Sequence, residues 1–201
     1  MERVKSHESF DPARLADLEI QSIKYEFQDN QKAKFDCGVQ STQLMYGINE
    51  VSAYRTMVAK RKIENKELSD DERRNARIEF FQTISTASGL GFDPYEAALA
   101  DEKLDLAKES EDKKKIIGCL AGVFSILYKK PASVFREPTR LLLKFTDELY
   151  EQLAFAMMRS PSFVMGMGSG ARSEIEKNMD FDKLQKSSLK RWKSLKQAIE
   201  S

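Results

Sequence analysis

Apolar residues recur at helical spacing along almost the whole chain, and this periodicity restricts the possible folds more than any other feature. Ala16, Ile20, Ile23 and Phe27, for example, fall on one face of a helix. The alternation with a period of two that marks half-buried strands is absent over any useful length, and no internal repeat is visible. The sequence therefore predicts an all-α protein.

Helix-capping residues divide this pattern into segments. Asp-Pro pairs at 11–12 and 93–94 place a capping Asp before a Pro at the first helical position. Ser69 and Glu72 have the spacing of a capping box, and Asp180 caps the last apolar stripe. We expect about seven helices, covering residues 12–28, 39–64, 70–88, 94–108, 116–129, 138–159 and 181–200, with a charged loop at 109–115.

The glycines near residue 166 mark the predicted boundary within the chain. We expect a helical bundle over residues 1–160, a flexible loop rich in Met and Gly over 161–172, and a basic amphipathic helix over 173–201. The loop sequence MGMGSG (165–170) superficially suits a phosphate. A nucleotide-binding fingerprint, however, needs a strand before it, a helix directly after it and, for a P-loop, a Gly-Lys-Ser/Thr end, and we predict none of these at the loop. A hinge or linker is the preferred interpretation.

The residue inventory argues against catalysis. The single histidine, His7, lies in the first few positions, so no other His can pair with a nucleophile or bind a metal. Cys37 and Cys119 are too far apart in sequence for metal-ligand spacing, and two thiols do not make a disulfide framework. We therefore expect no enzyme activity, no catalytic residues, no cofactor and no metal, with a carboxylate-based enzyme as a third possibility.

Charge and hydropathy restrict the compartment and the partners. There are 33 basic and 32 acidic residues, so any attraction to an acidic partner must be local. The most apolar segment, residues 116–128, is interrupted by Gly118 and Gly122 and is too short to cross a bilayer. We expect no transmembrane segment and no secretion signal, while a transit peptide that was already removed stays possible.

The last predicted helix carries the candidate contact residues. Its basic side chains and its tryptophan form the predicted site for a partner or a membrane: Lys183, Lys186, Lys190, Arg191, Trp192, Lys193 and Lys196. They suit anionic lipid headgroups or nucleic-acid phosphates. The alternative, which we prefer, is a solvated basic face whose apolar stripe packs on the bundle; Leu184, Ser188, Trp192, Leu195 and Ile199 form that stripe.

Four methionines lie close to the predicted loop. We expect Met157 in the core, and Met158, Met165 and Met167 partly exposed. Because methionine surfaces adapt to varied partners, this cluster is a weak indication of a partner groove.

Several blocks resemble, in order, the thylakoid formation family, also called the photosystem II biogenesis protein family. They are LMYGINEVSAYRTM (44–57), residues 74–81 followed by FDPYEAALADEKLDLA (92–107), GCLAGVFSIL (118–127) and FDKLQKSSLKRWKSLKQAIE (181–200). The chain departs from the family at Phe35-Asp36-Cys37, where the family has an aromatic-Asp-Pro sequence, and at Ala59-Lys60-Arg61, which replaces its Gly-Tyr. The segment 128–172 is also longer than the family pattern leads us to expect.

The resemblance implies an all-helical, non-enzymatic protein in the chloroplast stroma, at the thylakoid surface or on the cytoplasmic side in cyanobacteria. It implies a role in photosystem II assembly and repair, with photosystem subunits or the FtsH protease as partners. We therefore expect an accessory or assembly protein that docks on a photosynthetic membrane complex, with peripheral membrane contact. The alternative is a viral or phage structural or nucleic-acid-packaging protein, and nucleic acid stays the less favoured partner.

Overall fold

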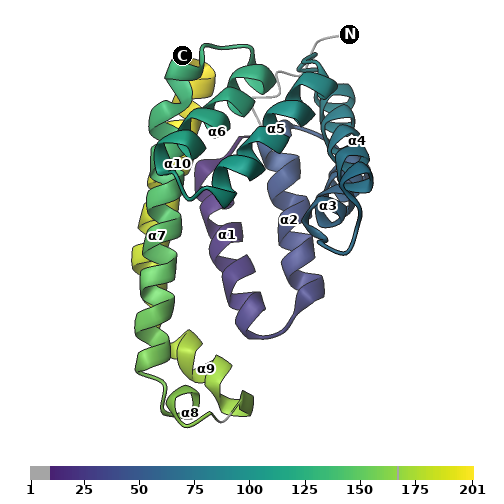
Figure 1. Cartoon of the computed structure of the whole chain (residues 1–201). Coiled ribbons are helices and arrows are strands. Elements are labelled where there is room, and N and C mark those ends of the chain that lie inside the picture. Colours follow the sequence, from purple (N-terminus) through teal and green to yellow (C-terminus); the bar gives the residue numbers. More distant parts are fainter. Residues whose placement is uncertain (1–9, 167) are drawn as a thin grey trace.

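The computed structural model describes residues 10–166 and 168–201, which form an all-helical structure (Figure 1). His7 lies outside this part of the chain. The described residues contain ten α-helices and one short 3₁₀ helix, more than the seven helices expected. Their bounds are α1 Pro12–Phe27, α2 Gln31–Tyr46, α3 Glu50–Glu64, α4 Asp70–Ser88, α5 Pro94–Glu109, α6 Lys113–Tyr128, η1 Ala132–Phe135, α7 Arg136–Met158, α8 Pro161–Val164, α9 Gly168–Asn178 and α10 Phe181–Glu200.

The predicted caps are confirmed where a polar side chain precedes a helix. Asp11 accepts hydrogen bonds from the first backbone N–H groups of α1, and Asp93 does the same for α5. Ser69 and Glu72 form both hydrogen bonds of the capping box at the start of α4. Asp180 caps α10 through the N–H of Lys183 at 2.9 Å. These helix starts follow directly from local hydrogen bonding.

The single helix expected over 39–64 is wrong, because the chain is broken there into α2 and α3. Gly47 ends α2 in the left-handed conformation, with φ of 62°, and Asn49 caps α3 by accepting a hydrogen bond from the N–H of Ser52. Glycine adopts this conformation without the steric cost that a Cβ imposes. The apolar spacing of Leu44, Ile48, Val51 and Val58 continues across the break, so periodicity alone does not show it.

Two further boundaries differ from the expectation. The charged segment 109–115 is not entirely a loop, because Asp112 caps α6 and the helix begins at Lys113. The segment 161–172, expected as a loop, contains α8 and the beginning of α9, so a helix begins within the glycine-rich sequence itself, at Gly168. Met167 lies outside the described residues.

The larger of two apolar cores lies where α2 to α6 meet the ends of α1 and α10. Phe135 is fully buried there, and its ring lies 5.7 Å from that of Phe124 and 5.9 Å from that of Tyr128. Aromatic pairs at such distances add to the stability gained from burial alone. We call this cluster the large core. The sequence predicts α6 as a central core helix, but only one face of it is buried. That face carries Ala121, Val123, Leu127 and Tyr128.

A second, smaller apolar cluster holds the other end of the molecule together. It joins α1, α7, α9 and α10, and its buried members are Ile20, Phe145, Ala156, Ala171, Ile175, Met179 and Leu184. We call it the small core. In Figure 1, α8 and α9 lie at the end of the long helix α7 that is remote from α5 and α6.

Helix α10 links the two cores. Leu184, near its beginning, lies in the small core, and Leu195, Ala198 and Ile199 lie in the large core. The helix lies alongside α7 (Figure 1), and it also contacts α1. Across residues 10–166 and 168–201, no helix combines the length and the apolar character needed to span a bilayer.

Candidate docking surface on helix α10

The inner face of α10 is fixed to α1 by a buried polar cluster. The Arg191 guanidinium donates a hydrogen bond to the Glu19 carboxylate at 2.6 Å, and the Ser188 hydroxyl donates to the same oxygen. Arg191 also lies against the Phe145 ring, 5.1 Å from its centroid. Burial lowers the pKa of Arg191, whereas the charge and hydrogen bond of Glu19 act in the opposite direction. These contacts set the rotation of α10 about its own axis.

Trp192 belongs to the packed side of the helix. Its ring lies 6.0 Å from that of Phe10 in an edge-to-face arrangement, and Arg191 lies over it at 4.2 Å. Trp192 and Arg191 therefore have partners inside the molecule. This arrangement matches the preferred alternative, in which the apolar stripe of α10 packs on the bundle.

The opposite face of α10 presents a row of exposed lysines. Lys183, Lys186, Lys190 and Lys193 are spaced by three, four and three residues, which places them on one face over about 15 Å. We call them the lysine row. None of the four forms an ion pair within the described residues. Lys196 differs, because it is half-buried and lies 3.8 Å from Glu200.

A shallow groove of about 480 Å³ runs between the lysine row and α7. Leu141 and Leu189 contribute apolar surface, and Lys186, Lys190 and Lys193 line the same groove. Glu137 is the acidic residue beside it. Hydrogen bonds from Arg140 hold the pKa of Glu137 below its usual value, and the charge of Lys190 acts in the same direction. The groove thus combines a basic rim with a small apolar surface.

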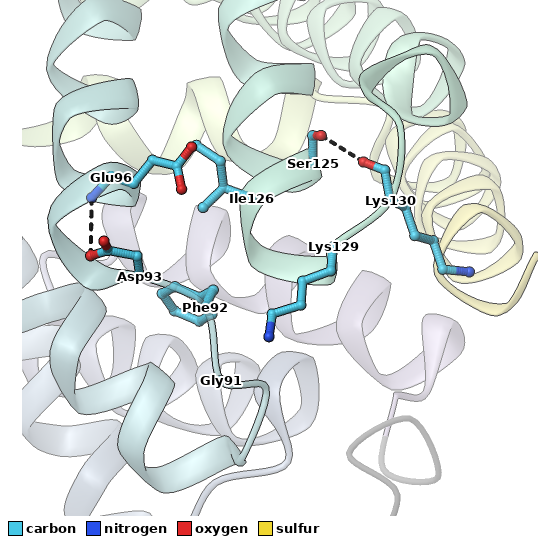
Figure 2. Close-up of a pocket in the computed structure, with 8 residues that line it drawn as sticks. All are labelled: Gly91, Phe92, Asp93, Glu96, Ser125, Ile126, Lys129 and Lys130. Carbon is cyan, nitrogen blue, oxygen red and sulfur yellow. Dashed lines mark hydrogen bonds between the residues drawn. The ribbon is translucent and has the colours of Figure 1, made fainter.

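A second hollow, of about 360 Å³, lies between α5 and the end of α6 (Figure 2). Its polar groups mostly serve the helix ends. Asp93 accepts from the N–H groups of Tyr95 and Glu96, and the Ser125 hydroxyl donates to the carbonyl of Lys130. Three charged groups that line it, Glu96, Lys129 and Lys130, have no ion-pair partner within the described residues. Because side chains of both signs line the hollow, their charges do not indicate one class of ligand.

A buried ion cluster joins α4 to α5. Arg77 donates to Asp101 at 3.1 Å and also to Asp105. Burial and the neighbouring charge of Asp105 raise the pKa of Asp101, although Arg77 opposes the shift. Carboxylates here compensate a buried guanidinium, which is a structural role. In the part of the chain that the structure describes, no three His, Cys, Asp or Glu side chains gather as a metal site.

The sequence interpretation grouped seven residues of α10, and the structure divides them into two faces. The lysine row lies outside, Arg191 and Trp192 lie inside, and Lys196 lies between. Sequence reasoning missed Glu19, the partner of Arg191. The spacing of Arg191 from Ser188 and Leu195, three and four residues, places it on the buried stripe and was the available signal.

Comparisons with protein-family models, with curated proteins and with solved structures found no match to this chain.

Proposed function

We propose that this chain is a non-enzymatic helical assembly protein that docks, through the lysine row, on a photosynthetic membrane complex during photosystem biogenesis or repair. The observation that carries the proposal is the one-sided character of α10, with four exposed lysines outside and the Arg191–Glu19 pair inside. The named complex comes from the sequence blocks that resemble the thylakoid formation family. The corresponding location is the chloroplast stroma, the thylakoid surface or the cytoplasmic side in cyanobacteria.

The lysine row suits recognition of an acidic surface. Its lysines form no ion pair within the described residues, and the helix that carries them is held on two cores. A fixed array of like charges accelerates encounter with a complementary partner and sets its orientation. Near an anionic membrane surface, each such lysine contributes about 1 kcal/mol. The small groove beside the row adds apolar contact area, from Leu141 and Leu189, to the attraction between charges.

The test is affinity capture of the tagged full chain from its own cells under mild detergent, followed by identification of the captured proteins. We compare the wild type with Lys186→Glu combined with Lys190→Glu. The matched control is Lys114→Glu combined with Lys115→Glu, which makes the same charge change at the exposed start of α6. We expect photosystem subunits or the FtsH protease with the wild type and the control, and at least a tenfold loss with the row variant.

Three outcomes would overturn the proposal. Equal capture by both variants would remove the lysine row from the contact. Recovery of the wild-type chain with no photosystem subunit and no protease would remove the named partners. Capture of nucleic acid or capsid proteins, with binding that weakens steeply as salt rises, would favour the packaging alternative.

A further inference from the structure

The end of α7 and the short helix α8 expose a group of apolar side chains. Met158 is 70% exposed, Val164 68% and Met165 69%, and Phe163 beside them is 43% exposed. We call these four residues the apolar tip. They lie at the end of the molecule that is remote from α5 and α6, where α8 forms the turn between α7 and α9 (Figure 1). Large apolar side chains that gather on an exposed surface indicate an interaction site.

The turn that carries the apolar tip is held by polar contacts behind it. Glu174 on α9 accepts hydrogen bonds from the Ser160 hydroxyl at 2.7 Å, the Ser162 N–H at 2.9 Å and the Ser162 hydroxyl at 2.6 Å. Ser160 is fully buried. Backbone hydrogen bonds from Val164 to Ser160 and from Met165 to Pro161 close the turn. The exposed apolar side chains are thus presented by a fixed backbone.

Exposed basic side chains flank the apolar tip. From Phe155 to Asn178 the exposed charged residues are Arg159, Arg172 and Lys177. Arg172 forms an ion pair with the exposed Asp29 at 3.2 Å, whereas Arg159 and Lys177 form no ion pair within the described residues. Both acidic residues of this segment are half-buried and hydrogen-bonded: Glu174 to the two serines, and Glu176 to Gln28. The same hydrogen bonds hold the pKa of Glu174 below its usual value. An apolar tip flanked by two exposed basic side chains that form no ion pair, Arg159 and Lys177, is complementary to an anionic lipid surface.

The shape of the tip favours a bilayer over a protein groove. Helix α8 has four residues, little more than one turn, so it has no extended apolar face to lay into a groove. A short turn with its apolar side chains outermost suits shallow entry into the boundary between headgroups and acyl chains. Arg159, which lies 4.1 Å from the Phe155 ring, is close enough in sequence to meet the headgroups.

We propose that the apolar tip inserts into the surface of an anionic phospholipid bilayer, with Arg159 and Lys177 facing the lipid phosphates. The tip is a site separate from the lysine row, and the proposal does not depend on the function proposed above.

The first experiment is vesicle flotation of the full chain. Vesicles of phosphatidylcholine alone are compared with an equal mixture of phosphatidylcholine and phosphatidylglycerol. We expect binding to the mixed vesicles, and a loss of at least about tenfold for Val164→Ser combined with Met165→Ser. The matched control is Leu99→Ser combined with Leu106→Ser, which removes two exposed apolar side chains from α5 without touching the tip. Neither pair changes the charge of the protein.

The second experiment reports the depth of insertion. A Val164→Trp variant places an indole on the exposed tip, while Trp192 of the wild type, packed against Phe10, is the internal reference. With brominated phosphatidylcholine in the mixed vesicles, we expect quenching of the variant beyond that of the wild type. The fluorescence of the variant also moves to shorter wavelength on binding.

Several results would overturn the proposal. They are absence of wild-type binding to the mixed vesicles, equal binding by the tip variant, and an indole at position 164 that is not quenched. If Lys186→Glu with Lys190→Glu abolishes flotation and the tip variant does not, the membrane contact belongs to the lysine row. If the wild type is a dimer in lipid-free solution and the tip variant is a monomer, the tip contacts a second copy of the chain.

Discussion

The two ends of the molecule are stabilised in different ways. At the end formed by α2 to α6, aromatic and aliphatic side chains fill the large core, and Phe135 is fully buried. At the end formed by α8 and α9, the small core has fewer members, and Met158, Val164 and Met165 stay outside it. There the turn is held by hydrogen bonds to Glu174. The comparison teaches that apolar residues remain available for a partner where polar contacts hold the backbone.

The largest expected effect comes from the large core. We expect Phe135→Ala to lower the free energy of unfolding by about 3–5 kcal/mol, because it removes a fully buried ring and leaves a cavity. Phe163→Ala at the apolar tip should change it by less than about 1 kcal/mol, because that ring is already 43% exposed. Urea unfolding followed by circular dichroism measures both values. Similar losses for the two variants would remove the contrast between the ends.

The buried ion pair that joins α1 to α10 should have the next largest effect. Glu19→Gln removes the charge opposite the buried Arg191, and we expect a loss of about 3 kcal/mol in the free energy of unfolding. The control is Asp29→Asn, which breaks the exposed pair with Arg172 and should cost less than about 1 kcal/mol. Urea unfolding of the two variants decides the point. An equal loss in the free energy of unfolding for the two variants would mean that the burial of Arg191 does not increase the effect of removing its partner.

A smaller and local effect is expected at the apolar tip. Ser160→Ala removes one of the three hydrogen bonds to Glu174 and should destabilise the turn by about 1 kcal/mol. Hydrogen exchange should then quicken over residues 160–178 and stay unchanged in α5 and α6, because the cores are separate. Ser110→Ala, whose exposed hydroxyl bonds only the Ala107 carbonyl, is the control. Faster exchange throughout the chain would argue against two separately held ends.

The smallest expected effect is a difference in proton affinity between the ends. Burial, with the charge of Asp105, raises the pKa of Asp101 above 3.8, and the two serines lower the pKa of Glu174 below 4.5. The lowered pKa of Glu174 means that its stabilisation is complete above pH 4.5 and is lost as the pH falls through the lowered value. The raised pKa of Asp101 has the opposite effect on stability. The folded state binds this proton more tightly than the unfolded state, so the contribution of Asp101 to the free energy of unfolding decreases as the pH rises.

We therefore expect Asp101 to take up its proton at a higher pH than its ordinary value, and Glu174 at a lower one. Carboxyl-carbon NMR titration of the folded protein measures both pKa values. Glu174→Gln identifies the tip signal by its disappearance. A Glu174 pKa above 4.5 would contradict the hydrogen-bonded arrangement of the turn.

Local signals account for what the sequence predicted correctly. Ser69 with Glu72, and the Asp-Pro pairs at 11–12 and 93–94, determine helix starts through neighbouring atoms, so they were visible in the sequence. The break at Gly47 was missed because apolar spacing continues through it, and α8 was missed because a helix of four residues has no periodicity.

The candidate surface was predicted only in part for a related reason. Lysines on α10 are evident in the sequence, but the face they occupy depends on Glu19, which lies 172 positions before Arg191. The exposure of Val164 likewise depends on how α8 sits against Ser160 and Glu174, and no local pattern encodes it. Contacts between distant segments therefore decide which residues are available to a partner.

The pairing of α10 with α1 has a consequence for the order in which the chain folds during synthesis. Ser188 and Arg191 reach Glu19 across separations of 169 and 172 residues. At the usual pace of a ribosome, α1 therefore emerges roughly 10–30 s before its partner helix. During that interval the apolar face of α1 that α10 covers stays open to other nascent chains and to chaperones. The synthesis of α10 thus ends the interval in which this face of α1 is exposed.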